Sequence, residues 1–300
     1  MQRKNVQSPI FGHLAVLVTI TIWATTYVFT KALLEHLTPS QILVVRSLLG
    51  LLFLSLLSPK KLHYVKRIDR LFIALAGFCG IFLYYFLENT ALLYTSATNV
   101  GVIVAAAPFT TLLASRIFLK DEKLHLSYFI GLILSMTGIV ILTVPKGTAI
   151  AVSPFGDFLA VAAICVWALY TTLTRIIGRR GYPNLAVTRD MFFWGLVGHT
   201  IVLVSSGQSL PLRTITEKEV LLPLLFLGLV ASALCFALWN YGLRSIGPVT
   251  SSFYLYLSPI ITIVVATTFL GEPFTFVDGV GTALTLSGLV VSQWRFGGKK

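Results

Sequence analysis

The chain has 300 residues, of which 56% are hydrophobic and 11% are charged, and its mean hydropathy is +0.86. A soluble globular protein carries about 25% charged residues. The composition therefore excludes a soluble enzyme or a DNA-binding domain as the bulk of the chain, and it excludes disorder as well. The formal net charge is +12. In a soluble protein that charge would indicate a nucleic-acid partner, so the positions of the basic residues decide its meaning.

Apolar stretches long enough to cross a bilayer follow one another along the whole chain. About 20 apolar residues span a membrane as a helix. The sequence predicts ten such helices, at 12–34, 40–57, 70–94, 97–118, 124–144, 156–178, 184–206, 220–245, 248–270 and 274–294. Proline, glycine and short basic runs separate these stretches, and none of the connections is long enough for a soluble domain. We therefore predict an all-α membrane protein with a single membrane domain.

The basic residues gather on one side of the predicted helices. With the N-terminus inside, 17 of the 23 Lys and Arg residues fall on the cytoplasmic side, 4 fall on the other side, and Arg46 and Arg189 lie within helices. Because short basic loops stay in the cytoplasm, this asymmetry predicts a multi-pass protein of the cell (inner) membrane with both termini cytoplasmic. The basic rim would contact anionic lipid, and it does not indicate nucleic acid.

An internal repeat divides the chain into two halves. Trp23 and Pro39 each lie 144 residues before an identical residue, Trp167 and Pro183. Later identities have offsets of 150 or 151, and they are Asn89 with Asn240, Pro108 with Pro259, Glu122 with Glu272, Gly131 with Gly281, and Gly138 with Gly288. We predict two five-helix repeats, residues 1–147 and 148–300. Because five is odd, the second repeat is inverted in the membrane, as in secondary transporters that work by alternating access.

Two stretches of the sequence resemble a known transporter family. The first is Ala91–Glu122, ALLYTSATNVGVIVAAAPFTTLLASRIFLKDE, and the second starts at Trp239 and reads WNYGLRSIGPVTSSFYLYLSPIITIVVATTFLGEPF. Both resemble the EamA type of the drug/metabolite transporter superfamily, although the first lacks the Gly–Glu pair found at Gly271–Glu272. The resemblance implies ten helices, with helices 1–4 and 6–9 around a central cavity. It also implies export or uptake of small metabolites, often amino acids.

Ionisable side chains inside the predicted helices are candidates for function, because a charge at mid-membrane costs about 2.5–3.5 kcal/mol. The sequence predicts an outer and an inner ionic layer, which would act as gates or bind a zwitterionic substrate. The outer layer consists of Lys31, Arg46 and Glu88, and the inner layer of Arg175, Arg189 and Asp190. Glu88 is also a candidate for proton coupling. Snorkelling to the headgroups and purely structural pairing are the alternatives.

Aromatic and amide side chains in the helices are candidates for the wall of a substrate cavity. The predicted cavity residues are Trp23, Tyr27, Tyr84, Glu88, Asn89, Asn99, Trp167, Tyr170, Trp239, Asn240 and Tyr254. The repeat-related pairs Trp23/Trp167 and Asn89/Asn240 would face the axis from both halves. Such a wall favours amphipathic organic solutes over phosphorylated ones, which would need a basic cluster at mid-depth. Packing or interfacial anchoring is the alternative for each aromatic residue.

Proline and glycine mark two further features. Pro108 and Pro259 fall near the middle of the fourth and ninth predicted helices, where each would kink its helix and serve as a cavity wall or hinge. A kink that only serves packing is the alternative. Two glycine pairs, Gly131 with Gly138 and Gly281 with Gly288, are each seven residues apart on one helix face, which indicates close helix packing. The oligomeric state stays open.

The sequence contains no nucleophile motif, metal-binding spacing or nucleotide-binding loop. We therefore predict a secondary transporter, in the export direction, of small organic metabolites such as amino acids or related amphipathic compounds. It would have no enzymatic activity, no cofactor and no metal. A membrane channel or a structural membrane protein without coupled transport is the alternative, and a membrane-embedded enzyme is the third hypothesis.

Overall fold

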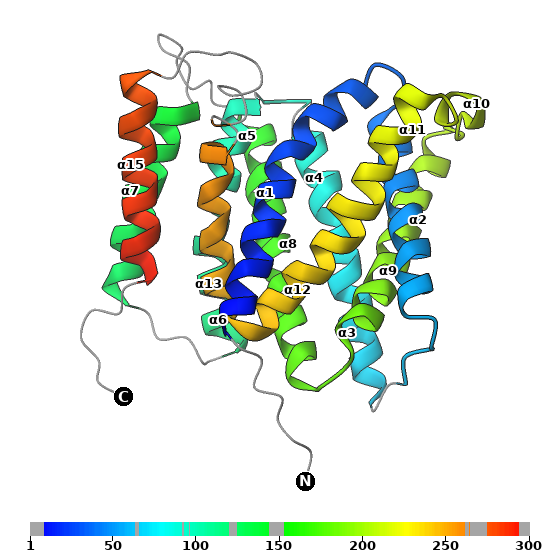
Figure 1. Cartoon of the computed structure of the whole chain (residues 1–300), viewed down its shortest axis with the longest axis horizontal. Helices are drawn as coiled ribbons and strands as arrows, with labels where there is room; N and C mark the ends of the chain where they lie inside the picture. The colour runs from blue at the N-terminus through cyan, green and yellow to red at the C-terminus, as the bar shows by residue number, and fades with distance from the viewer. Residues whose placement is uncertain are drawn as a thin grey trace.

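The computed structural model describes residues 9–63, 66–91, 93–95, 97–119, 125–143, 153–261, 264 and 275–293. Within these residues the chain is helical and contains no strand, in agreement with the predicted all-α class. Most of the helices lie side by side in one bundle, with their axes running between the same two ends (Figure 1). Pro9 at the start of the first helix and Gln293 at the end of the last described one lie toward the same end of the bundle (Figure 1).

The helices of the first half follow the predicted spans. They are α1 (Pro9–Leu33), α2 (Pro39–Leu57), α3 (Arg67–Gly77), the π-helix η1 (Phe78–Leu83), α4 (Tyr84–Ala91), α5 (Ala97–Val104), α6 (Ala107–Phe118) and α7 (Leu126–Thr143). The segments α3, η1 and α4 form one continuous helical stretch, so a single span contains three geometries.

The helices of the second half repeat much of this order. They are α8 (Pro154–Arg179), α9 (Asn184–Ser205), α10 (Leu212–Ile215), α11 (Lys218–Leu225), the π-helix η2 (Phe226–Leu234), α12 (Cys235–Ser245), α13 (Pro248–Phe253), the 3-10 helix η3 (Tyr254–Tyr256) and α15 (Phe276–Gln293). The ninth predicted span, 248–270, lies partly outside the described residues.

Six helical stretches are long and apolar enough to cross a membrane within the described residues. They are Pro9–Thr26, Pro39–Leu57, Arg67–Ala91, Pro154–Arg179, Asn184–Ser205 and Lys218–Ser245. Shorter apolar helices cover Val102–Phe118, Leu126–Leu142 and Phe276–Ser292. The described part of the chain therefore has the composition and helix lengths of a multi-pass membrane protein.

Local sequence signals explain where several helices begin. At the start of α2, the Gln41 N–H donates to Thr38 Oγ1 and the Thr38 N–H donates to Gln41 Oε1 (2.9 Å), while Pro39 occupies the first turn. This is a capping box, which satisfies backbone donors that a helix start leaves unpaired. Gly247, with φ +88°, reverses the chain before α13, a conformation that glycine adopts without strain.

Helix α8 is the centre of the bundle and packs against α3, α4, α5, α6 and α12. Small residues on α8, such as Ala160 and Ala163, are fully buried beside larger ones such as Tyr170. Gly80 of η1 allows the closest approach, because a Cβ there would lie 2.3 Å from the Tyr170 ring. Helix α8 therefore packs against helices of both halves of the chain.

The two π-helices occupy repeat-related positions. Shifting η1, Phe78–Leu83, by the offset of 151 gives residues 229–234, which lie inside η2, Phe226–Leu234. A π-helix displaces its side chains relative to an α-helix, and such segments are frequent at functional sites. Nothing in the sequence reading indicated them, although both halves have one at the same place.

Pro108 lies beside a local break in helical geometry. Helix α5 ends at Val104, Ala106 precedes the next helix, and α6 starts at Ala107 with Pro108 in its first turn. Pro108 thus lies just after a short break in helical geometry at 105–106, inside the apolar helical stretch Val102–Phe118. Proline fits there because the first turn of a helix leaves its N–H unpaired. Its repeat partner Pro259 lies in helical residues 257–261, directly after the 3-10 helix η3.

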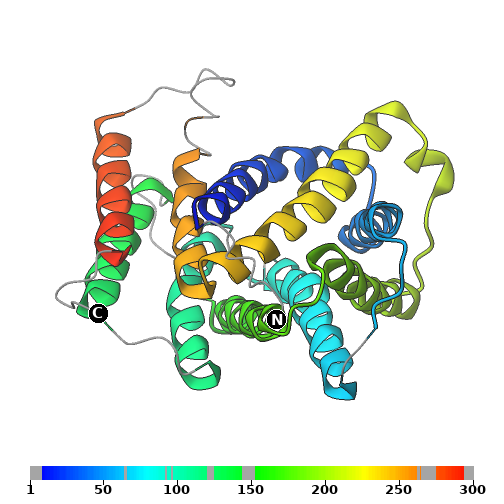
Figure 2. The same cartoon turned by 60° about the horizontal axis from the view of Figure 1, so that its bottom comes forward.

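Helices α7 and α15 form a pair at one side of the bundle (Figures 1 and 2). A Cβ on Gly131 would lie 2.6 Å from the Gly288 carbonyl oxygen, and one on Gly138 would lie 2.6 Å from the Gly281 carbonyl oxygen. The prediction of close packing at these glycines is confirmed. Since the earlier residue of α7 meets the later residue of α15, the two helices run antiparallel.

Gly138→Val is expected to destabilise the protein by about 1–3 kcal/mol, because the added atoms would meet the backbone of α15. The measurement is the thermal midpoint of the detergent-purified protein. Ser287→Val is the matched control, since Ser287 is an exposed residue of α15 and its substitution adds similar bulk away from the interface. Equal midpoints for the two variants would contradict the interpretation.

Candidate functional site

Three tryptophan rings from both halves of the chain meet at the centre of the bundle. Trp23 of α1 lies 5.8 Å from Trp167 of α8 and 5.4 Å from Trp239 of α12, and Trp167 lies 5.7 Å from Trp239, between ring centroids. Trp23 and Trp167 are the repeat-related pair, and the structure brings them into contact. Phe236 of α12 also packs against both of them.

The indole N–H groups of this cluster differ in their partners. Trp23 Nε1 donates to the Ala231 carbonyl oxygen in η2 (2.8 Å), which fixes its ring. Trp167 and Trp239 are buried, and their Nε1 donors find no acceptor within the described part of the chain. Because an unsatisfied buried donor costs free energy, these two N–H groups are candidates to donate to a polar group of a bound solute.

Two tyrosines of α4 extend the aromatic cluster toward a carboxylate. The Tyr84 ring lies 5.1 Å from Trp167 and 5.3 Å from Tyr85, between ring centroids. The Tyr84 hydroxyl donates to Glu88 Oε1 (2.8 Å), one helical turn further along α4. Glu88 is only partly buried. The predicted pairing of Tyr84 and Glu88 on one helix face is present, and it orients one carboxylate oxygen.

Arg46 of α2 completes the site. Its Nε donates to Ser232 Oγ in η2 (2.9 Å), and its guanidinium carbon lies 5.1 Å from the centroid of the Tyr85 ring. Ser232 is the residue directly after Ala231, the acceptor of Trp23. The contacts therefore close into a ring, which we call the central aromatic site and which consists of Trp23, Arg46, Tyr84, Tyr85, Trp167, Ala231 and Ser232.

Two members of the predicted outer ionic layer, Arg46 and Glu88, lie within electrostatic range of each other and have different hydrogen-bond partners. Glu88 is bonded to Tyr84, Arg46 is bonded to Ser232, and no ion pair joins the two among the residues that the structure describes. Both side chains nevertheless adjoin the Tyr84–Tyr85 pair, so they border the same site. The side chains of Lys31, of the same layer, and of the predicted cavity residues Tyr27 and Asn99 lie outside the described residues.

Asn240 belongs to a buried network rather than to an open wall. The Tyr170 hydroxyl donates to Asn240 Oδ1 (2.6 Å), and Asn240 Nδ2 donates to Thr188 Oγ1 (2.9 Å). The side chains of all three are fully buried, and they connect α8, α9 and α12. Asn89, the repeat partner on α4, is partly buried. The two asparagines therefore have different environments in the two halves.

Tyr254 lies away from the central aromatic site. Its hydroxyl is 2.8 Å from His13 Nδ1, near the start of α1. The sequence placed Tyr254 in the cavity because it is an aromatic residue within a span, but its partner shows that it joins η3 to the beginning of α1. The pair connects the two halves at that end of the bundle.

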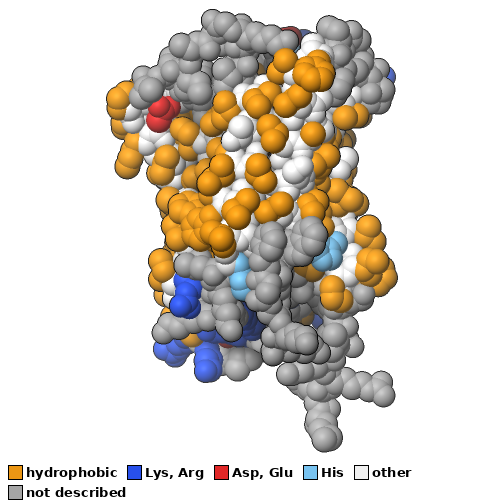
Figure 3. Space-filling model, turned by 90° about the vertical axis from the view of Figure 1, so that its left-hand side faces the viewer, with side chains coloured by type: hydrophobic (Ala, Val, Ile, Leu, Met, Phe, Trp, Pro, Cys, Tyr) orange, Lys and Arg blue, Asp and Glu red, His pale blue; other side chains and the backbone are white. Residues whose placement is uncertain are grey.

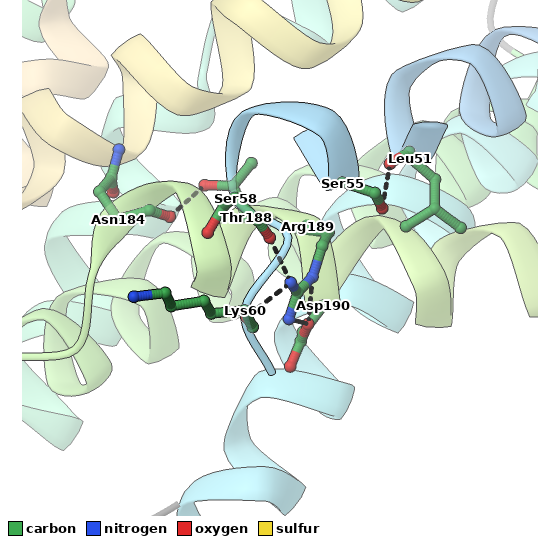
Figure 4. A network of polar contacts seen from close by, with 8 residues as sticks. All are labelled: Leu51, Ser55, Ser58, Lys60, Asn184, Thr188, Arg189 and Asp190. Atoms are coloured by element: carbon green, nitrogen blue, oxygen red, sulfur yellow. Dashed lines mark hydrogen bonds and ion pairs between the residues drawn. The ribbon is translucent and has the colours of Figure 1, made fainter. Parts of the chain in front are cut away.

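The arginines of the predicted inner layer bind the ends of other helices. Arg175 donates to the carbonyl oxygens of Leu243 (3.0 Å) and Arg244, in the last turn of α12. Arg189 donates to the carbonyl oxygens of Ser58 and Lys60, just after α2, as Figure 4 shows. The carbonyl end of a helix attracts cations, so these contacts have a structural explanation.

Asp190 of the inner layer contacts its own neighbour. Its Oδ1 accepts from Arg189 Nε (2.9 Å) and Nη2 (2.7 Å), so both groups lie beside the chain that leaves α2 (Figure 4). On the same helix, Thr188 Oγ1 donates to the Asn184 carbonyl oxygen (2.9 Å). This region connects the start of α9 to the end of α2.

A buried ionic cluster that the sequence reading missed lies at the same end of the bundle. Asp69, in the first turn of α3, is almost fully buried, and it pairs with Arg180 and accepts from the Tyr182 hydroxyl. Arg244 Nη1 donates to the Tyr182 carbonyl oxygen (2.6 Å). We call Asp69, Arg180, Tyr182 and Arg244 the Asp69 cluster. It joins α3, the turn after α8 and the end of α12.

One signal for this cluster was present in the sequence. Asp69 is the single acidic residue in the stretch 59–70, which contains five basic residues. The basic residues were counted as a rim, and the lone acid among them was not considered as a partner for one of them.

Comparison with known proteins identifies the family. The model of the EamA-like transporter family matches residues 10–144 and 154–293. The chain belongs to this family. The EamA-like transporter has one match in each predicted repeat, and the long apolar helices of the structure make it a multi-pass membrane protein.

Relatives of this EamA-like transporter are described as transporters. An uncharacterized transporter of Archaeoglobus fulgidus is 28% identical over 286 residues, which cover 93% of this chain and 96% of the relative. A probable terminal-alkyne amino-acid exporter of Streptantibioticus cattleyicolor is 24% identical over 287 residues, which cover 95% of this chain and 94% of the exporter. A solved crystal structure shares the fold, with a TM-score of 0.76, 18% identity and coverage of 94% and 96% of the two chains.

Proposed function

We propose that this EamA-like transporter is a secondary exporter of amino acids or related small amphipathic compounds, and that it works by alternating access without enzymatic activity. The observation that carries the proposal is the central aromatic site. It combines Trp23, Arg46, Tyr84 and Tyr85 from the first half with Trp167, Ala231 and Ser232 from the second. A site at the interface of two repeats is where such transporters bind their solute.

The proposed architecture is ten helices in two inverted five-helix repeats, 1–147 and 148–300. The antiparallel contact of α7 with α15 supports this arrangement, because these are the last helices of the two halves. The repeat-related π-helices η1 and η2 support it as well, since η2 contains Ala231 and Ser232 of the central aromatic site and η1 directly precedes Tyr84. Because the two halves are structurally equivalent, the bundle can adopt two equivalent tilted conformations. Exchange between these conformations is alternating access.

The chemistry of the site favours amphipathic solutes. Its rings offer an apolar wall, whereas Arg46 and Glu88 add one charge of each sign at its border. A phosphorylated solute would need several cations around one anion. The similarity to an amino-acid exporter supports the same class.

The proposed orientation places both termini in the cytoplasm, in the cell (inner) membrane. Figure 3 shows hydrophobic side chains over the upper and middle part of one face and Lys and Arg side chains gathered toward its lower end. A basic rim on one side of a hydrophobic band favours a cytoplasmic position for that side and contact with anionic lipid there. No nucleic-acid partner is part of the proposal.

Counterflow in proteoliposomes tests the function. Vesicles preloaded with unlabelled amino acids are expected to accumulate the labelled amino acid transiently and saturably, and a proton gradient is expected to drive wild type more strongly than Glu88→Gln. Linear, unsaturable flux would favour the channel alternative, and a chemically altered solute would favour the enzyme. Protein-free vesicles are the control.

A further inference from the structure

Arg46 is a buried cation that forms no ion pair with a carboxylate among the described residues. It is 7% exposed and lies seven residues into α2, about 10 Å from the helix start at 1.5 Å per residue. The Arg46 side chain hydrogen-bonds to two neutral groups, the side chains of Ser232 and Tyr85. Glu88 interacts with Arg46 electrostatically, but its carboxylate accepts its hydrogen bond from Tyr84. A buried charge is costly without a close counter-charge, so this position favours binding of an anion.

The surroundings of Arg46 fix the direction of its guanidinium. Nε is held by Ser232 Oγ on one edge, and the Tyr85 ring lies against the guanidinium at 5.1 Å. The two Nη nitrogens are left on the other edge. The Nε1 atoms of Trp167 and Trp239 are fully enclosed and have no hydrogen-bond partner among the described residues. The Nη atoms of Arg46 do not belong to that group. An oriented fork of two N–H donors matches the two oxygens of a carboxylate.

The other side chains of the site indicate the charge of that anion and the kind of group attached to it. Arg46 is the one cation that the described residues place in the central aromatic site, and Glu88 at its border is hydrogen-bonded to Tyr84, so a single carboxylate is enough to pair with the guanidinium. The ring of Trp167 contacts those of Trp23 and Tyr84, and the three rings provide apolar surface in the same site. A carboxylate attached to an apolar or aromatic group therefore fits both parts of the site.

We propose that the Nη edge of Arg46 binds the carboxylate of the transported solute while its apolar group lies against the tryptophan and tyrosine rings. The solutes would thus be carboxylates, including amino acids with a free carboxyl group, and amides or amines of the same shape would bind weakly. This inference rests on the proposed function and deepens it by assigning the group that the solute must carry.

Direct binding to the purified full-length protein tests the assignment independently of transport. The probes are phenylacetate with phenylacetamide, and L-phenylalanine with L-phenylalaninamide, measured by titration calorimetry. Wild type is expected to bind each acid at least about tenfold more tightly than its amide, and Arg46→Gln is expected to bind the two alike. Arg46→Lys keeps the charge without the fork, so it should retain part of the preference. Arg213→Gln, at an exposed residue of α10, is the matched control and should bind as wild type does.

The outcomes separate the inference from the function. If wild type binds no carboxylate probe, or if folded Arg46→Gln still prefers the acids, the assignment of Arg46 is wrong. If Arg46→Gln does not fold, an undiminished acid preference in Arg46→Lys also overturns it. Acid binding that depends on Arg46 in a protein without counterflow would instead overturn the proposed transport and leave the carboxylate site in place.

Discussion

Asp69→Ala is expected to lower the free energy of unfolding by about 3 kcal/mol, because it leaves Arg180 and the Tyr182 hydroxyl without their buried acceptor. The lower end of the usual range applies because the Arg180 side chain is 31% exposed whereas that of Asp69 is 2% exposed. Thermal unfolding of the detergent-purified protein measures the loss. Glu219→Ala is the control, since Glu219 is an exposed acid in the first turn of α11.

A functional effect is expected from the same substitution. The Asp69 cluster ties α3 and α12 to the turn after α8, so in a protein that works by alternating access it stabilises closure of this end of the bundle. A loss of about 3 kcal/mol changes a two-state ratio roughly 100-fold. Counterflow should fall accordingly, and Asp69→Arg combined with Arg180→Asp should restore part of it. Wild-type stability and transport in Asp69→Ala would show that the cluster has neither role.

Trp239→Ala is expected to have the largest effect on stability, about 3–5 kcal/mol. Trp239 is fully buried and contacts both Trp23 and Trp167, so the substitution leaves a cavity at the centre of the bundle. The measurement is the midpoint of thermal or denaturant unfolding. Phe193→Ala is the control, because Phe193 is an exposed aromatic residue of α9.

Trp239→Phe separates packing from hydrogen bonding. Trp239 Nε1 has no acceptor among the described residues, whereas Trp23 Nε1 donates to Ala231. Trp23→Phe therefore loses a hydrogen bond worth about 1 kcal/mol that Trp239→Phe does not lose. If Trp239 Nε1 contacts the solute, Trp239→Phe should weaken counterflow more than stability. A stability loss from Trp239→Phe as large as that from Trp239→Ala would contradict this account.

The fold was largely predictable because a bilayer constrains helices strongly. Hydropathy located the helical stretches. The offset of 144 marked Trp23 and Trp167 as residues that face the axis from both halves, and the structure places their rings 5.8 Å apart. The seven-residue glycine spacing predicted close packing of both helices, since glycine on a helix face allows backbones to approach. It did not show that α7 and α15 are each other's partners, which the structure adds. These features depend on local composition or on exact identities between the halves.

The site was predicted only in part, because its geometry depends on helices that are distant in sequence. Arg46 was recognised as a buried charge, but its partners Ser232 and Tyr85 follow from the π-helix η2 and the packing of α4. A π-helix has no clear single-sequence signal, since it arises where tertiary contacts outweigh one regular hydrogen-bond register. The pairing of Asp69 with Arg180 likewise depends on tertiary packing, so the sequence does not indicate it.

The glycine contacts of α7 and α15 follow a reciprocal rule. Gly131 meets Gly288, the counterpart of Gly138, and Gly138 meets Gly281, the counterpart of Gly131. This is the isologous pattern by which two identical subunits associate about a two-fold axis. Each helix of the pair therefore presents the same glycine face to the other, so the contact has the self-complementary geometry of a homodimer interface within one chain.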